Sequence, residues 1–212
     1  MTINTFHNVF THEEIKQLIN FYASLPVSNT KYLPDGRLFR IIKNSEYNLE
    51  DQAAFKILNP KLTEILGPHQ FTGGHWMDSY SPFCVHIDNI SNYNQRGVSV
   101  FEAETHKNIG VLIPLCEHEH FKTIFFDCLL DNLDPGYLDK LSNVNNPELS
   151  SEFMTLVDHH SDEEYNKIKK IKLDCIVDWK IGDVFSWPRD QLHCSSNFAK
   201  YNLNKQAIVL WL

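Results

Sequence analysis

Two histidines and an aspartate are the residues best placed to do chemistry in this sequence. His86 and Asp88 stand one residue apart at the end of a strand-like run. Alternate residues of a strand face the same side, so this imidazole and this carboxylate project together. His193 is the best third partner, because it follows another strand-like run and a turn at Pro188. Two histidines and one carboxylate leave open positions on iron(II), as in non-haem iron oxygenases, so we expect a metal site of His86, Asp88 and His193.

Short strands must position these residues. The predicted strands cover residues 76–87, 109–115, 122–128, 174–179, 183–187 and 205–212. Turn residues such as Gly73-Gly74 and Gly182-Asp183 separate them. Several short strands without helices between them predict an antiparallel sandwich or barrel, and jelly rolls are built in this way.

Helices are expected before these strands. Thr11 and Glu14 have the spacing of a capping box, and apolar residues follow at helical spacing, which predicts a helix over residues 11–24. A second helix is predicted over residues 49–66, where Pro60 should kink or split it. Residues 37–42, between the two helices, favour a strand.

One polar segment interrupts the strands. Residues 130–172 are acidic and rich in Asn, Asp and Ser, and segments of this length inside a domain are usually lids or disordered. A second capping box, Ser161-Asp162-Glu163-Glu164, predicts a helix near its end. We therefore expect a single domain over residues 1–212, with helical support in residues 1–70 and a β core in residues 71–212 that carries this insertion.

The order of these motifs resembles the 2-oxoglutarate/iron(II) dioxygenase superfamily, nearest its phytanoyl-CoA-hydroxylase-like and prolyl-hydroxylase-like branches. The resemblance rests on the His-Ile-Asp motif at 86–88, the run Val111-Leu112-Ile113-Pro114-Leu115, the aromatic run at 122–126, the Gly182-Asp183 turn and the last strand, which begins with a lysine at 205. It implies a fold that is mainly β with flanking helices, around a double-stranded β-helix (a cupin-like jelly roll).

The resemblance also implies an activity. Such a protein would be a 2-oxoglutarate- and Fe(II)-dependent oxygenase that uses molecular oxygen and releases succinate and carbon dioxide. Hydroxylation is the expected outcome, and we expect a small molecule or an amino-acid side chain as the substrate.

The co-substrate 2-oxoglutarate needs a fixed cation for its far carboxylate, because burying an unpaired carboxylate is very costly. Lys205 stands at the position that matches the family's basic residue, on the strand after His193, and Ser195 is the matching helper hydroxyl. Lys122 is the alternative, since some branches of the family place a lysine on the fourth strand.

Other functions can use the same architecture. A non-catalytic cupin-like module that binds a metal or a ligand is the main alternative, and a zinc-dependent isomerase or hydrolase is a third. A plain binding module has no need of a buried cation at Lys205. The sequence contains no GxSxG nucleophile elbow and no glycine-rich phosphate loop that opens a helix.

Other residues that could bind a metal or line a pocket are better explained as parts of a surface loop or of the core. Cys116, His118 and His120 would share one face of a strand as zinc-type ligands, but the segment lies between two core strands, which favours a surface loop. The pair His159-His160 is expected in a lid or in solvent. Four more residues are expected in the core rather than in a pocket: His75, Trp76, Cys84 and Trp187.

Charge and cysteine usage limit the partners and the compartment. The net charge of -8 argues against nucleic acid as a partner. No apolar run is long enough to predict a membrane span, and the N-terminus does not have the pattern of a secretory signal. The 5 cysteines are odd in number and scattered, which indicates reduced thiols and a cytoplasmic protein.

Overall fold

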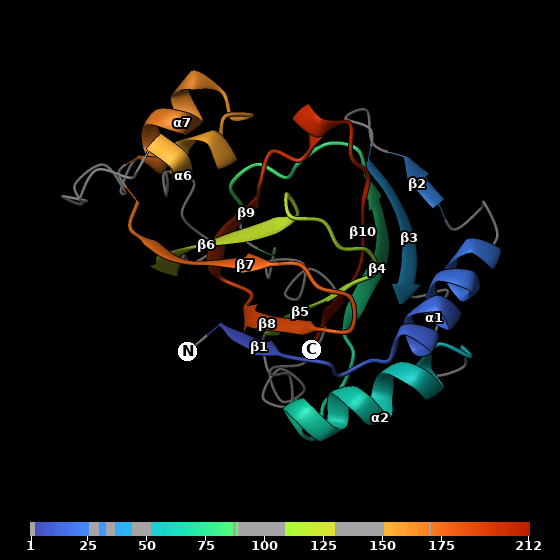
Figure 1. Cartoon of the computed structure of the whole chain (residues 1–212). Coiled ribbons are helices and arrows are strands. Elements are labelled where there is room, and N and C mark those ends of the chain that lie inside the picture. The colour runs from blue at the N-terminus through green and yellow to red at the C-terminus, as the bar shows by residue number, and fades with distance from the viewer. Residues whose placement is uncertain are drawn as a thin grey trace.

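The computed structural model describes residues 3–25, 30–32, 37–43, 52–86, 88, 109–129, 151–169 and 171–212. Two antiparallel sheets form its centre, and helices flank them on opposite sides (Figure 1). The prediction of a mainly β, antiparallel fold with flanking helices is confirmed. None of the helices within these residues is long and apolar enough to span a membrane.

The larger sheet places strands side by side that are far apart in the sequence. Its order is β1 (Asn4–Phe6), β8 (Val184–Pro188), β5 (Ile109–Pro114), β10 (Lys205–Trp211), β4 (Gly73–Ser79), β3 (Arg37–Lys43) and β2 (Thr30–Tyr32). The smaller sheet has the order β7 (Leu173–Asp178), β6 (Lys122–Leu129) and β9 (Gln191–Ser195). The last strand of the chain therefore lies between β4 and β5.

Alternation along the strands builds the layers. In β10, Ala207 and Val209 belong to the apolar cluster that joins the two sheets, whereas Ile208 and Leu210 face the N-terminal helices. In β6, Phe125 faces the other sheet, and its neighbours on either side face outward. This is the period of two that a strand buried on both faces must have.

The N-terminal helices cover the outer face of the larger sheet. Helix α1 (His12–Ser24) has the predicted capping box, in which the Glu14 amide donates to Thr11 Oγ1 at 3.2 Å and the Thr11 amide donates to Glu14 Oε2 at 2.8 Å. Helix α2 (Phe55–Leu66) ends at Gly67. It runs unbroken through Pro60, so of the two expected effects of this proline, a kink or a split, the split is wrong. Burial of apolar residues on both sides of the proline compensates for the one hydrogen bond that its ring removes.

The bounds of helix α2 and of strand β4 differ from the predicted ones. Helix α2 begins at Phe55, and residues 49–51 of the predicted range lie outside the described part of the chain. The predicted strand 76–87 is two pieces, because β4 ends at Ser79 and His86 forms an isolated bridge to His193. Pro82 has no amide hydrogen to continue the ladder, and Ser79 Oγ donates to the Ser81 carbonyl in a tight turn.

Two short helices cover the outer face of the smaller sheet. Helix α6 (Ser151–Leu156) was not predicted, whereas α7 (Asp162–Ile168) follows the second capping box as predicted. Their apolar residues join those of β6 and β9 in one cluster, and both helices lie on the opposite side of the molecule from α1 and α2 (Figure 1). Residues 130–150 of the predicted insertion lie outside the described part of the chain.

Candidate metal centre

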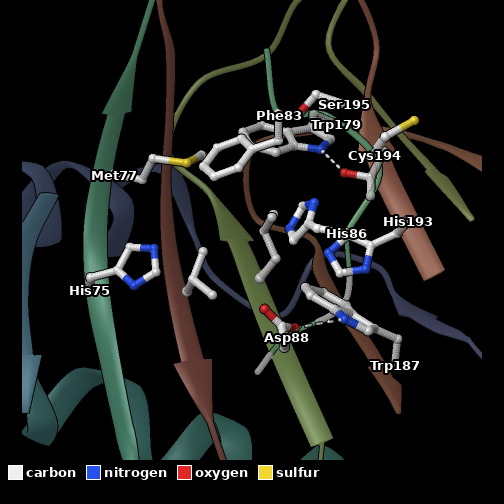
Figure 2. A pocket seen from close by; sticks show the side chains of 13 residues that line it. His75, Met77, Phe83, His86, Asp88, Trp179, Trp187, His193, Cys194 and Ser195 are labelled. Carbon is white, nitrogen blue, oxygen red and sulfur yellow. Dashed lines mark hydrogen bonds between the residues drawn. The ribbon is translucent and has the colours of Figure 1, made fainter. Parts of the chain in front are cut away.

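The structure brings His86, Asp88 and His193 together. Each offers one ligand atom, and these atoms lie within 4.8 Å of one another. Within the described residues this is the only such group of three or more His, Cys, Asp or Glu side chains. Strand β9 supplies His193, and two backbone hydrogen bonds of 2.9 Å between His86 and His193 hold the two segments side by side (Figure 2).

Hydrogen bonds orient both imidazoles. His86 Nδ1 lies 2.7 Å from the Cys84 carbonyl oxygen, and His193 Nδ1 lies 2.8 Å from the Gln191 carbonyl oxygen. A carbonyl only accepts, so each Nδ1 carries the hydrogen, and in the neutral form of such a ring Nε2 has the lone pair. This arrangement fixes tautomer and ring direction in histidines that bind metals through Nε2.

The carboxylate of Asp88 is oriented in a comparable way. Trp187 Nε1–H donates to Asp88 Oδ2 at 3.1 Å, which leaves Oδ1 for another partner (Figure 2). The indole and the carboxylate approach each other over Gly110 of β5. A Cβ atom at Gly110 would lie 2.8 Å from Trp187 Cε2 and 2.9 Å from Asp88 Oδ2, so no larger residue fits there without displacing one of them.

A cavity opens beside the three side chains, and mostly apolar residues line it. Besides the triad, its walls consist of His75, Met77, Phe83, Leu112, Thr123, Trp179, Trp187, Cys194, Ser195 and Val209. These residues come from both sheets, so the cavity lies in the space between them (Figure 2). Such a concave, largely apolar space with a few convergent polar groups is typical of a ligand site.

Several residues of the cavity were missed or misplaced by sequence reasoning. His75 is half-buried and lines the cavity, so its assignment to the core is wrong. His75 and Met77 are two residues apart in β4 and therefore share one face of the strand, which the sequence could have shown. Trp187 is buried in the core and lines the cavity as well, whereas Trp76 is buried in the core, as expected, in the cluster that includes the N-terminal helices. Cys84 is exposed, because the strand that was expected to bury it ends at Ser79.

The two candidate lysines point in different directions. Lys122 forms a salt bridge with Asp178 at the surface. Lys205 is 1% exposed, donates from Nζ to the Lys122 carbonyl at 2.9 Å, and lies 3.8 Å from the centroid of the Trp179 ring. It has no carboxylate partner among the described residues. Burial lowers the pKa of the Lys205 ammonium to about 7.

Trp179 lies between Lys205 and the cavity. Lys205 does not line the cavity itself, but Trp179, which it contacts, does. Trp179 Nε1–H donates to Thr123 Oγ1 at 2.9 Å, which holds the indole in place. Ser195 and Thr123 both line this end of the cavity, and both are buried.

The remaining histidine-rich segments do not add ligands to this centre. Cys116 accepts a hydrogen bond from the Gln206 amide at 3.1 Å, and the His120 ring stacks on Tyr201 at a centroid distance of 3.6 Å. Residues 117–119 are exposed, which agrees with the expectation of a surface loop in this segment. His159 and His160 are not among the residues that line the cavity, and both bind the backbone of residues 83–85. The expectation of solvated side chains is wrong for His160, which is buried, whereas His159 is half-buried.

Comparison with known proteins identifies proteins that share this fold. No protein-family model matches the sequence, and no curated protein matches it by sequence. Solved structures do match: a prolyl-4-hydroxylase of Pseudomonas putida, with 10% identity, a TM-score of 0.50 and coverage of 99% of this chain and 90% of the other. The chain has the fold of 2-oxoglutarate/iron(II) oxygenase structures.

Two further structures support the same assignment of the fold. SnoN, a non-haem α-ketoglutarate-dependent epimerase of nogalamycin biosynthesis, matches with 10% identity, a TM-score of 0.57 and coverage of 98% and 76%. HygX of Streptomyces hygroscopicus, solved with nickel and 2-oxoglutarate bound, matches with 12% identity, a TM-score of 0.55 and coverage of 98% and 81%. The resemblance inferred from motif order is therefore confirmed at the level of the fold.

Proposed function

We propose that this protein is a 2-oxoglutarate- and Fe(II)-dependent oxygenase, built as one domain around a double-stranded β-helix. His86, Asp88 and His193 would hold the iron. The observation that carries the proposal is the arrangement of these three side chains: a hydrogen bond orients each of them, and one ligand atom from each lies within 4.8 Å of the others.

The donor set suits iron(II). Two imidazole nitrogens and one carboxylate oxygen on one side of the ion are the facial triad of non-haem iron oxygenases, and they leave positions for a co-substrate and oxygen. With 2-oxoglutarate and oxygen, such an iron supplies oxidation of a substrate C–H bond, with release of succinate and carbon dioxide. The protein contributes ligand geometry, a cavity with few polar groups and substrate placement.

Lys205 supports 2-oxoglutarate as the co-substrate. A buried ammonium without a carboxylate is costly, and an anionic ligand would supply the missing charge. We propose that Lys205 and Ser195 hold the far carboxylate. Because the Trp179 indole lies against the ammonium and also lines the cavity, it would have to move as that carboxylate binds. Lys122 is less suited, since Asp178 already balances its charge.

The substrate we propose is a small molecule or an amino-acid side chain, and hydroxylation is the proposed outcome. Met77, Leu112 and Val209 give the cavity an apolar wall suited to an unactivated C–H bond, and His75 adds a polar group. Among proteins of similar fold are an epimerase and a carbocyclase, so the reaction outcome needs its own test.

The decisive experiment is an anaerobic titration of metal-free protein with iron(II) and 2-oxoglutarate, which follows the visible charge-transfer band of the chelate. We expect a band in the wild type, no band in His86→Ala, and a much higher 2-oxoglutarate requirement in Lys205→Ala. If the wild type binds iron without developing the band, the oxygenase proposal fails and a metal-binding module replaces it.

A further inference from the structure

The segment that carries His86 uses one of its edges to pair with β9. His86 exchanges two backbone hydrogen bonds with His193, and the Ser195 amide donates to the Phe83 carbonyl at 3.1 Å. In an antiparallel ladder the amide of the intervening residue points to the other side. At Val85 that other side has no strand partner in the described residues, and a buried amide without an acceptor would be costly.

His160 supplies the acceptor. The Val85 amide donates to His160 Nε2 at 3.1 Å, and His160 Nδ1 lies 2.8 Å from the Val157 carbonyl oxygen. A carbonyl cannot donate, so Nδ1 carries the hydrogen and Nε2 presents its lone pair. These two contacts require the neutral Nδ1–H tautomer, and the side chain is 8% exposed. The histidine thus takes the place of a neighbouring strand.

His159 adds a second bond to the same segment. Its Nε2 lies 3.3 Å from the Phe83 carbonyl oxygen, which also accepts from the Ser195 amide. The Val85 side chain packs into the apolar cluster that α6 and α7 form on the outer face of the smaller sheet. The helices between residues 151 and 168 are therefore fastened to the backbone immediately before His86 by both polar and apolar contacts.

We propose that His160, assisted by His159, is a positioning residue that holds the His86 segment against β9, so that metal affinity depends on the hydrogen bonds of these two histidines to residues 83–85. This inference rests on the proposed function, because it assigns His86 to the metal. It also gives the helical end of the insertion a role in building the metal centre rather than in contacting substrate.

A second attachment of the same helices provides a matched control. Lys200 Nζ donates to the Thr155 carbonyl at 2.7 Å and lies 3.4 Å from Asp158 Oδ2. It fastens the end of α6 to the 3₁₀ helix η4 (Ala199–Tyr201), and both of these hydrogen bonds go to residues outside the segment 83–86. Lys200→Met therefore removes one attachment of these helices and leaves the acceptor for Val85 intact, so it separates a general loosening of the helices from loss of the His160 hydrogen bond.

The test is a calorimetric titration of the metal-free protein with nickel(II), with thermal unfolding of each variant in parallel. We expect His160→Ala to weaken nickel binding about ten- to a hundredfold, as loss of groups that orient metal ligands does. His160→Gln should remain within about threefold of wild type, because its amide oxygen can accept from Val85. The nickel affinity of Lys200→Met should also remain within about threefold of wild type, because this variant keeps the hydrogen bond between Val85 and His160.

Equal losses in His160→Ala and Lys200→Met, or undiminished binding in His160→Ala, would overturn the inference. If His160→Ala does not fold, the ¹⁵N NMR spectrum of the wild-type His160 imidazole provides the test. A neutral Nδ1–H tautomer together with a slowly exchanging Val85 amide supports the proposed role of His160. A charged His160 ring overturns it. Failure of the wild type itself to bind nickel would instead refute the proposed function, and this inference with it.

Discussion

The affinity for 2-oxoglutarate should fall as the pH rises from 6 to 8, because Lys205 must be protonated to bind a carboxylate. Burial lowers the pKa of this ammonium to about 7 in the absence of a ligand. Both carboxylates of the co-substrate stay ionised over this range, so Lys205 is the group at the far carboxylate that changes its charge. The sign follows directly: protonated lysine binds, and its fraction decreases above the pKa.

The magnitude follows from the same value. With a pKa near 7, about 90% of Lys205 is protonated at pH 6 and about 10% at pH 8, so the apparent dissociation constant should rise about tenfold. Bound carboxylate favours the charged form and raises the pKa again. Binding at pH 8 should therefore take up nearly one proton per co-substrate, whereas binding at pH 6 should take up almost none.

The assay is an anaerobic titration at saturating metal, in buffers with different ionisation enthalpies, so that affinity and proton uptake come from one experiment. Lys205→Arg is the matched control, since its charge does not change in this range and both pH effects should disappear. A wild-type affinity that is flat from pH 6 to pH 8, or an equal slope in Lys205→Arg, would refute the assignment of Lys205 to the far carboxylate.

Three other predictions follow from individual contacts. Trp187→Phe removes the donor to Asp88 Oδ2 but keeps an aromatic ring, so metal affinity should fall about tenfold in a nickel titration; an unchanged affinity would contradict the role given to the indole. Gly110→Ala places a Cβ 2.9 Å from Asp88 Oδ2, so it should weaken nickel binding as well, and wild-type affinity would mean that the strand yields. Lys205→Met should raise the free energy of unfolding by up to about 4–5 kcal/mol at pH 6, because burial lowers the pKa of Lys205 from 10.5 to about 7 and each unit corresponds to about 1.4 kcal/mol. Since the folded pKa lies below the unfolded one, this difference should shrink between pH 7 and pH 10; a difference in urea unfolding that is independent of pH would contradict it.

Local features of the fold were predictable where a short stretch of chain carries the whole signal. The capping box at Thr11 needs only residues three apart, and it begins α1 as predicted. Most core strands were also found, because apolar runs between turn residues are local. Strand β9 was missed because its sequence, Gln-Leu-His-Cys-Ser, contains neither an apolar run nor a β-branched residue, although every residue in it is buried.

The prediction of a continuous strand through residues 76–87 failed for the opposite reason. The apolar pattern continues past Ser79, but the proline at position 82 and the turn before it interrupt the ladder. The His86 segment returns to the sheet through one bridge to His193. A pattern of side chains reports which residues prefer burial, and it does not report whether the backbone amides have partners.

The sequence by itself determined the residue types at the candidate centre: an imidazole and a carboxylate at His86 and Asp88, a second imidazole at His193, and lysines that begin two core strands. Only the tertiary structure decided which of these groups meet and in which state. Burial against Trp179 gives Lys205 different surroundings from Lys122, which pairs with Asp178, and the contacts from Trp187 and His160 come from segments distant in the chain. The physical reason is that ligand direction, protonation and burial depend on neighbours that folding brings together, whereas sequence spacing specifies only local geometry.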